Sequence, residues 1–447
     1  MKVRFCRTPE FWLSAAGTAG LAVLFALWLA SGPDVSPAGM AAAALSAVLA
    51  GAVFIRFVPA WMGFWRGGSD TAVIDGEPAN AAAGAFVMFL AFDVLVLMLV
   101  ALLRLALGLD HTFAELLEFW RGTDSRHYLD IAREWYLSSG NIDRLVQLVF
   151  LPGYPLLVRA VWLIVGNDIA AGLIVSALCF AASGSVIYRL LRLDMPHGEA
   201  MRTLKYICIL PGSFFFAAPM SESLFLLLCS ACIYLARTRR WVLGCLCGGA
   251  AAFTRSTALA LLVPLVFELV AARRSVTGRQ FACRCASMAL VLAGFGAYMA
   301  VNWAVSGDPL KFMEYQHEHW SQNFGLFFNT PAYQLDQAAA SWKGIPQNTL
   351  GLWIPNLIYC FAALIFMALA AKNMRASYTA WFIAYYFVAI GATWLLSAPR
   401  YLIALLPVPL SVSMAAGTTA RDGAITAVSA LLAILYLYAF VMRWQVW

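Results

Sequence analysis

Charged side chains are scarce in this chain. Only 12% of its 447 residues are Asp, Glu, Lys or Arg, against about 25% in an ordinary soluble domain. Hydrophobic residues make up 62% of the sequence, and the mean hydropathy is +0.77. The core of a soluble protein cannot bury this much apolar surface. Disordered chains are poor in hydrophobic residues, so this composition excludes them too. The sequence therefore predicts an integral membrane protein, with room for about a dozen spanning helices.

Several signatures of common functions are missing. The sequence contains no G-x-x-x-x-G-K-[ST], no H-E-x-x-H and no G-x-S-x-G, which excludes a P-loop ATPase and the common metalloproteases and α/β-hydrolases. It contains no nucleic-acid-binding motif. The net charge of +7 is therefore attributed to Lys and Arg in cytoplasmic loops. No Asn-x-Ser/Thr sequon occurs, which favours a bacterial plasma membrane over the endoplasmic reticulum membrane of a eukaryote.

Cysteine is present, but not in a pattern that indicates chemistry. Most of the ten cysteines lie inside apolar runs, where Cys behaves as a small hydrophobic residue. Cys229 and Cys232 have the spacing of a redox or zinc site, but the surrounding segment is uniformly apolar. We interpret them as a membrane-buried pair and expect no disulfides.

The hydropathy pattern predicts an all-α polytopic membrane protein with about thirteen spans. Residues 149–166 are also apolar, but we expect them to be interfacial or re-entrant, because counting them as a span would move the basic loop 189–205 outside. Two prolines and a glycine in this piece also favour a broken helix. The predicted spans are 11–30, 38–60, 80–107, 169–189, 203–218, 221–236, 241–253, 256–272, 282–305, 351–371, 376–396, 400–416 and 424–442.

This topology places two long polar stretches, 108–148 and 306–350, on the outer side of the membrane. Long polar loops in a compact protein usually carry function. We expect both to form helices lying on the outer face. Residues 1–79, with two spans, are interpreted as an N-terminal addition to a catalytic unit over 80–447.

The first outer stretch contains the strongest candidate for acid–base chemistry. Asp124 stands at a Gly-Thr break and is followed by Ser-Arg-His-Tyr. It could simply cap a helix, but it could also act as a general base, with Arg126 and His127 close enough to modulate it. Tyr128 would lie in the same site.

Other candidates come from the remaining outer segments. Glu222 begins a span, where it could cap the helix or bind substrate. Arg255 lies at a break between two short apolar runs, and a charge at such a break is expensive unless it lines a cavity. Arg400 could extend to the interface or bind an anion. His317 and His319 could also help to hold a phosphate. A metal site is the weaker interpretation of this His pair, because no third ligand is placed beside it.

These residues put one acid, several cations and aromatic rings on the same side of the membrane. The arginines could bind a phosphate or diphosphate while Asp124 takes the proton of a hydroxyl. This combination suits group transfer from a lipid-linked phosphate donor. No metal or cofactor is expected.

Five short stretches then indicate a family. In order, they resemble a Trp-Asp-x-x-x-Tyr loop, a Phe-Pro-x-x-Pro segment, a Ser-Ala-Pro-Tyr-Ser-Glu-Ser-Leu-Phe element, and Thr-Arg and Arg-Tyr signatures. Together, over about residues 110–410, they resemble the GPI mannosyltransferase 2 (PIG-V-like) family of GT-C glycosyltransferases, which has many bacterial relatives. The stretches are 124–132, 150–159, 215–225, 254–256 and Arg400-Tyr401.

The resemblance implies a GT-C-like transmembrane bundle that transfers a sugar with inversion from a polyprenyl-phosphate donor, dolichyl-phosphate-mannose in eukaryotes. It implies Asp124 as the base and a glycan or glycolipid as the acceptor. Thr123 and Met220 replace a Trp and a Tyr of the family pattern, which leaves the sugar and the acceptor open.

Two other functions remain open on the residues alone. A transporter or flippase for a lipid-linked saccharide would show paired broken helices and mid-span acids, and Asp93 is the one mid-span acid to consider. A non-catalytic scaffold for envelope assembly would use the outer loops for docking.

Overall fold

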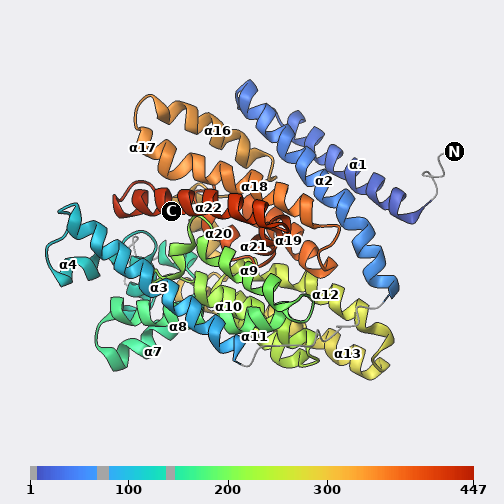
Figure 1. The fold of residues 1–447 in the computed structure, drawn as a ribbon, viewed down its shortest axis with the longest axis horizontal. Helices are drawn as coiled ribbons and strands as arrows, with labels where there is room; N and C mark the ends of the chain where they lie inside the picture. Colours follow the sequence, from blue (N-terminus) through green and yellow to red (C-terminus); the bar gives the residue numbers. More distant parts are fainter. Residues whose placement is uncertain (1–7, 68–79, 137–145) are drawn as a thin grey trace.

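The computed structural model describes residues 8–67, 80–136 and 146–447, and these form an all-α polytopic membrane protein (Figure 1). The described residues contain no β-strand, only one isolated bridge between Phe324 and Ala392. Eight helices or helical runs are long and apolar enough to cross a membrane. They are α1 (Pro9–Ala30), α2 (Pro37–Gly67), α3 (Ala81–Ala106), α8 (Asp168–Leu191), η5–α12–η6 (Ser256–Leu261, Leu262–Ala271, Ala272–Arg274), α13–α14 (Gly278–Ser287, Ala289–Ser306), α17–η7–α18 (Pro346–Asn348, Thr349–Trp353, Ile354–Ala370) and α22 (Thr419–Val441).

The remaining apolar helices are shorter. Three of them have 13 to 15 residues: α7 (Gly153–Val165), α11 (Trp241–Thr254) and α19 (Ala376–Ile390). The other short helices of the bundle are α9 (His197–Ile209), η4 (Ser213–Phe216), α10 (Glu222–Arg237), α20 (Ala398–Ile403) and α21 (Pro407–Ala415).

The predicted count of thirteen spans is not confirmed by helix length. The expected span 203–218 is helix α9, which ends before Pro211, followed by the short turn η4. The expected span 400–416 is divided into α20 and α21, and Pro407 begins the second helix. Leu210, just before Pro211, is extended and ends α9, as expected of a residue that precedes proline. Pro407 occupies the first position of α21, where its missing backbone N–H is tolerated.

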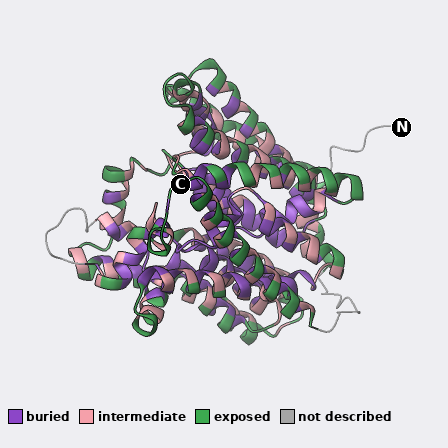
Figure 2. Cartoon of the chain, turned by 60° about the vertical axis from the view of Figure 1, so that its left-hand side comes forward, coloured by how far each residue is buried: buried purple, intermediate pink, exposed green. Residues whose placement is uncertain are grey.

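The outer surfaces of the bundle are apolar. Helix α3 exposes Val94, Leu95, Met98 and Leu102, each with about 47–58% of its surface accessible. Buried residues concentrate toward the middle of the bundle, and exposed ones lie on its periphery (Figure 2). Large aliphatic side chains exposed on long helices are stable in contact with lipid tails and not in water, so these faces contact the membrane.

Two packed groups of helices form the core. One group is α3, α8, α10, α11 and α14, packed side by side, with α7 against α8. In the other, α2 packs against α16 (Asn329–Trp342) and α18, and α18 packs against α21. Figure 1 shows α1 at the edge, lying along α2.

The N-terminal pair of helices is bonded to the polar stretch 306–350. The backbone N–H of Ser36 donates to Oδ2 of Asp336 in α16 at 2.7 Å, and its hydroxyl bonds the other carboxylate oxygen. A Cβ atom at Gly39 would lie 2.9 Å from the carbonyl oxygen of Ala332. The start of α2 therefore packs closely on α16.

The two stretches predicted to lie outside the membrane, 108–148 and 306–350, contain short helices. The first holds α4 (Phe113–Glu118), η2 (Phe119–Arg121), α5 (Ser125–Glu134) and η3 (Val146–Val149), and the second holds α15 (Lys311–Trp320) and α16. Helix α7, the apolar piece that the sequence analysis left outside the span count, has 13 residues. At 1.5 Å per residue it reaches about 20 Å, less than the ~30 Å of a hydrocarbon core.

Candidate active site

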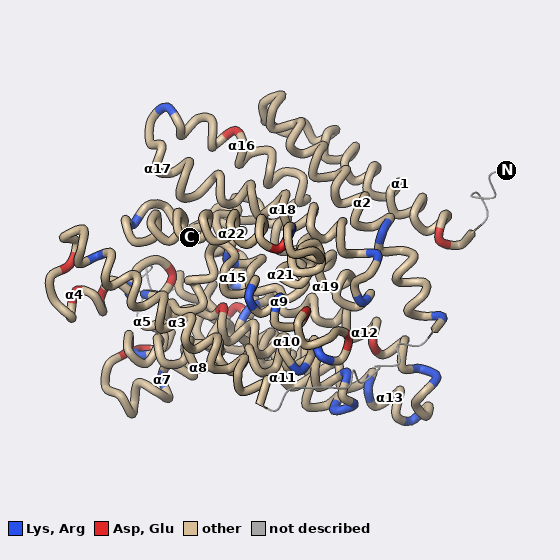
Figure 3. Tube along the Cα trace, in the orientation of Figure 1, with Lys and Arg blue, Asp and Glu red and all other residues tan. Residues whose placement is uncertain are grey.

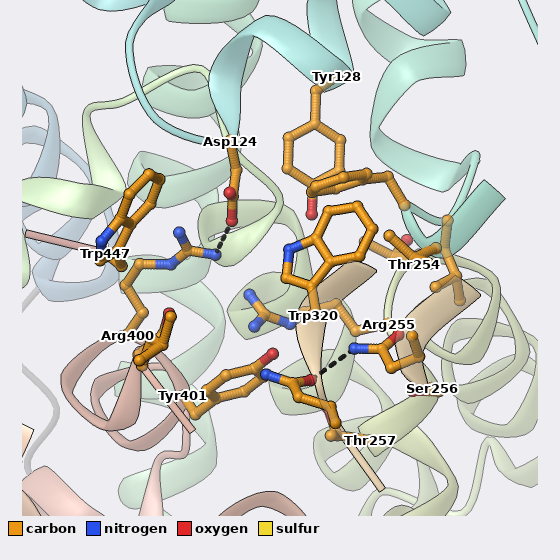
Figure 4. Close-up of a pocket in the computed structure, with 17 residues that line it drawn as sticks. Asp124, Tyr128, Thr254, Arg255, Ser256, Thr257, Trp320, Arg400, Tyr401 and Trp447 are labelled. Atoms are coloured by element: carbon orange, nitrogen blue, oxygen red, sulfur yellow. Dashed lines mark hydrogen bonds and ion pairs between the residues drawn. The ribbon is translucent and has the colours of Figure 1, made fainter. Parts of the chain in front are cut away.

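A cavity of about 290 Å³ lies where α5, the α11–η5 break, α15 and α20 meet. This is at the low end of the volumes typical of small-molecule sites, about 300–1,000 Å³. Its walls combine aromatic rings with a few charged groups (Figure 4). The lining side chains include Asp124, Tyr128, Thr254, Arg255, Gln316, Trp320, Gln322, Arg400, Tyr401 and Trp447.

Asp124 is placed by an unusual backbone conformation. Thr123, just before it, has φ +54°, a left-handed conformation that costs a β-branched residue energy. Asp124 is the N-cap residue of α5, yet its side chain makes no capping hydrogen bond. The carboxylate instead points at Arg400 (Figure 4), whose Nη2 donates to its Oδ2 at 2.7 Å. Helix capping therefore does not account for this residue.

Arg400 bonds two carboxylates at once. It is the third residue of α20, which begins at Ala398. Besides its bond to Asp124, its Nε donates to Oε1 of Glu222 at 3.0 Å. Only 3% of Arg400 is exposed, and its Nη1 has no partner among the described residues.

Glu222 in turn joins two arginines. Its Oε1 also accepts a hydrogen bond from Nη1 of Arg255 at 2.7 Å. Glu222 is fully buried and does not line the cavity, while both arginines do. Its side chain thus lies beneath the cavity wall. It bonds two guanidinium groups that line the cavity and is not itself part of the lining.

The four side chains form a chain of alternating charge: Asp124, Arg400, Glu222, Arg255. Three of them are at most 7% exposed, and the Asp124 side chain is 20% exposed. Burying unpaired ions would cost several kcal/mol each, so the alternation is what allows the charges to remain inside. Of the two carboxylates, Asp124 is the one that lines the cavity and keeps part of its side chain exposed.

Arg255 is placed by the break between α11 and η5. Its extended backbone, with φ −150° and ψ 130°, ends α11. The guanidinium lies 4.7 Å from the centre of the Tyr401 ring, within the range of a cation–π contact. The sequence analysis places Arg255 at a helix break and on a cavity, and the structure has it there.

Tyr128 and Tyr401 both line the cavity. The buried hydroxyl of Tyr128 is 3.0 Å from Oγ of Ser221, next to Glu222. Ser221 is also 3.4 Å from Nη1 of Arg255. Tyr128 therefore links helix α5 to the start of α10, next to Glu222.

Besides Glu222, four further predicted residues do not line the cavity. Arg126, His317 and His319 are exposed, and none of them lines it. His127 is stacked on Phe150, with ring centres 4.6 Å apart. Burial lowers the pKa of His127, and Arg126 lowers it further, while the negative charge of Asp124 opposes them. A neutral ring packed on an aromatic neighbour is a structural role.

The sequence analysis missed several lining residues. Gln316 and Trp320 come from the same helix as His317 and His319, but they are four residues apart and so share one face. Gln316 Nε2 donates to Oε1 of Gln322 at 2.6 Å. The helical spacing could have identified this pair. Nothing local could have identified Trp447, which reaches the cavity from beyond α22.

Residues 149–151 form part of the cavity wall, and Gly153, just after them, packs closely on the end of α11. A Cβ atom at Gly153 would lie 2.3 Å from Oγ1 of Thr254 and 3.0 Å from the carbonyl oxygen of Phe253. Only glycine fits between the first turn of α7 and the end of α11. The family-like segment 150–159 thus packs directly on the break that carries Arg255.

The other acids of the first outer stretch are engaged elsewhere. Arg104 bonds Asp110, Arg121 pairs with Glu118 and Asp130, and Glu115 forms a capping box. Asp143 lies outside the described residues. No group of three or more possible metal ligands occurs in the part of the chain that the structure describes. Comparisons with protein-family models, curated proteins and solved structures find no match for this chain.

Proposed function

We propose that the protein is an integral membrane glycosyltransferase that transfers a sugar from a polyprenyl-phosphate donor to a lipid-linked or envelope glycan. The observation that carries the proposal is that one accessible carboxylate, Asp124, shares a small cavity with the guanidinium groups of Arg255 and Arg400. A base and two anion-binding groups are what transfer from a phosphate to a hydroxyl requires.

The reaction divides between these groups. The acceptor hydroxyl loses its proton to the carboxylate of Asp124 as its oxygen bonds the anomeric carbon of the sugar. The bond from that carbon to the phosphate oxygen breaks, and the polyprenyl phosphate leaves with the electron pair. Arg255 and Arg400 stabilise the charge that develops on the leaving phosphate. The reaction inverts the anomeric centre.

The cavity walls also suit a sugar. The rings of Tyr128, Trp320, Tyr401 and Trp447 line the cavity, and aromatic faces offer flat apolar surfaces to the C–H face of a sugar ring. A small number of polar groups in a mainly aromatic pocket is typical of sites that bind and orient a small molecule. The resemblance to the GPI mannosyltransferase 2 family supports mannose as the sugar. The lack of sequons supports a bacterial plasma membrane.

An in vitro transfer assay tests the proposal. The purified full chain is incubated with polyprenyl-phosphate-mannose, polyprenyl-phosphate-glucose and nucleotide sugars in parallel, with membrane lipid extract as the acceptor source. Transfer is expected from a polyprenyl-phosphate sugar and not from a nucleotide sugar. General base catalysis typically contributes about 10²–10⁴-fold, so Asp124→Asn should lower turnover by that order.

Asp130→Asn is the matched control, because Asp130 lies on the same helix but pairs with Arg121, 3.6 Å away. It should retain most of the activity. Near-normal turnover in a folded Asp124→Asn variant would contradict the assignment of the base. Movement of a lipid-linked saccharide across the membrane without any transfer would favour a flippase instead.

A further inference from the structure

A second cavity, of about 330 Å³, lies at the far ends of the helices that form the candidate active site. Helix α10 starts at Glu222 beside Arg400 and ends at Arg237, which lines the second cavity. Sixteen residues of α-helix separate these ends by about 22 Å. Helix α11 returns from Trp241, at the second cavity, to Arg255. The two cavities therefore lie at opposite ends of one helical hairpin.

Arginine dominates the lining of this second cavity, which we call the arginine cavity. Figure 3 shows Lys and Arg gathered around α12 and α13, at this end of the bundle. Six arginines line the cavity, from the end of α10 and the turn after it, from η6, from the last turn of α13 and from the N-cap of α19: Arg237, Arg239, Arg273, Arg274, Arg284 and Arg375.

Two carboxylates neutralise part of this charge. Nε and Nη2 of Arg375 each lie 2.7 Å from an oxygen of Glu268. Arg237 bonds both oxygens of Asp194, at 2.5 and 2.7 Å. These two paired arginines are nearly buried and form the inner wall of the cavity.

The outer four arginines have no acidic partner among the described residues. Arg273 donates to two backbone carbonyls, those of Val270 and Trp65. Arg274 reaches the carbonyl of Arg66 at 3.4 Å. Arg284 stacks over Trp241, 5.2 Å from the ring centre. No carboxylate of the described chain lies within 4.0 Å of these three or of Arg239, so among the described residues positive charge exceeds negative charge around this cavity.

Two tryptophans favour a position of the arginine cavity at the depth of lipid headgroups. Trp65, at the end of α2, and Trp241, at the start of α11, line it together with the arginines. Trp is enriched where a membrane helix passes from hydrocarbon to water. Nε1 of Trp65 is buried without a partner among the described residues, so one more hydrogen-bond donor is left over beside the arginines.

We propose that the arginine cavity binds the phosphodiester headgroup of an anionic membrane lipid. Guanidinium groups bind phosphate oxygens through paired N–H bonds, and basic pockets between helices on the cytoplasmic side bind anionic headgroups. The lipid would neutralise the surplus charge and hold together the ends of α2, α10, η6 and α13. This inference does not depend on the proposed transferase activity.

Native mass spectrometry of the full chain tests this proposal, with phosphatidylglycerol, phosphatidylcholine and inorganic phosphate as probes in separate arms. The cavity variant is Arg274→Gln with Arg284→Gln. The matched control is Arg240→Gln with Arg279→Gln, which removes two exposed arginines at the same end that do not line the cavity.

We expect retention of phosphatidylglycerol over phosphatidylcholine. A charge-assisted contact is worth about 1.5–3 kcal/mol, so each lost contact should lower the affinity about 10- to 100-fold. The control should bind like the wild type. Equal retention of both lipids, or equal loss in cavity and control variants, would overturn the proposal. Binding of inorganic phosphate without phosphatidylglycerol would assign the site to a soluble anion and overturn the lipid.

A second measurement protects the test against a misfolded double variant. A ligand that binds the folded state raises its melting temperature. Added phosphatidylglycerol should therefore raise the melting temperature of the wild-type protein in detergent. The single variant Arg274→Gln, at an exposed position, should show a smaller rise. An identical rise in both proteins would place the lipid elsewhere.

Discussion

Asp124 and Arg400 lie 276 residues apart in the sequence, yet Nη2 of Arg400 donates to Oδ2 of Asp124 at 2.7 Å. The same guanidinium bonds Glu222, which bonds Arg255. A phosphate entering the cavity would meet Arg400 while Asp124 holds it, so the proposed base and the proposed phosphate site are electrostatically coupled. A substitution of either residue is therefore expected to affect both phosphate binding and the proton transfer.

The first prediction concerns the donor phosphate. Arg255→Ala and Arg400→Ala should each lower kcat/KM for a polyprenyl-phosphate sugar, because a charge-assisted contact worth about 1.5–3 kcal/mol is lost. Lys at either position should restore only part of the loss, since it lacks the planar guanidinium group. Steady-state kinetics over a range of donor concentrations measures this.

Arg126→Ala is the control for the first prediction, since Arg126 is exposed and does not line the cavity. It should leave the donor kinetics close to those of the wild type. Unchanged kinetics in both cavity variants would remove Arg255 and Arg400 from the donor site.

The second prediction concerns Glu222. Glu222→Gln removes the buried negative charge that two guanidinium groups share, and removing one partner of a buried ion pair typically costs about 3–5 kcal/mol. The melting temperature in detergent should fall clearly. Glu118→Gln is the control, because the Glu118 side chain is 61% exposed and such pairs contribute about 0–1 kcal/mol. Equal melting temperatures for the two variants would show that Glu222 does not anchor the arginines.

The third prediction is a pH dependence from His127. Burial lowers the pKa of His127 below its ordinary value of 6.5, so the unfolded chain takes up the proton first as pH falls. This group should leave stability unchanged above pH 6.5. Below that it should reduce stability, by at most about 1.4 kcal/mol per pH unit, until the folded ring is protonated too.

Melting temperatures between pH 5 and 8 measure this contribution. His127→Phe keeps an aromatic ring to stack on Phe150 but cannot titrate, so its melting temperature should fall less steeply below pH 6.5 than that of the wild type. Parallel profiles for the two proteins would show that His127 has no part in the acid sensitivity.

The fourth prediction concerns orientation. In a cysteine-free background, single cysteines at the exposed positions Glu118 and Lys343 should react with an impermeant thiol reagent in intact cells. Single cysteines at Arg240 and Thr277, which are exposed at the arginine-rich end, should react only after the membrane is opened. Labelling of the second pair in intact cells would invert the proposed topology.

The membrane class of the fold is readable from the sequence because it depends on local sums. About twenty consecutive apolar residues are needed to cross the hydrocarbon, and a window of that length contains the whole signal. The break at Arg255 is local in the same way. The number of long helices was harder to predict, because α9, α20 and α21 are short and begin or end near proline.

The composition of the candidate site shows what local patterns determine and what they cannot. The sequence by itself identified Asp124, Arg255 and Arg400, because each is a charged residue at a break in an apolar or helical pattern. Only the tertiary structure decided that Glu222 lies beneath the cavity, that Trp320 and not His317 faces it, and that Trp447 reaches it. These outcomes depend on how α5, α10, α15 and α20 pack together, and that packing is set by contacts between residues far apart in the chain, which no sequence window contains.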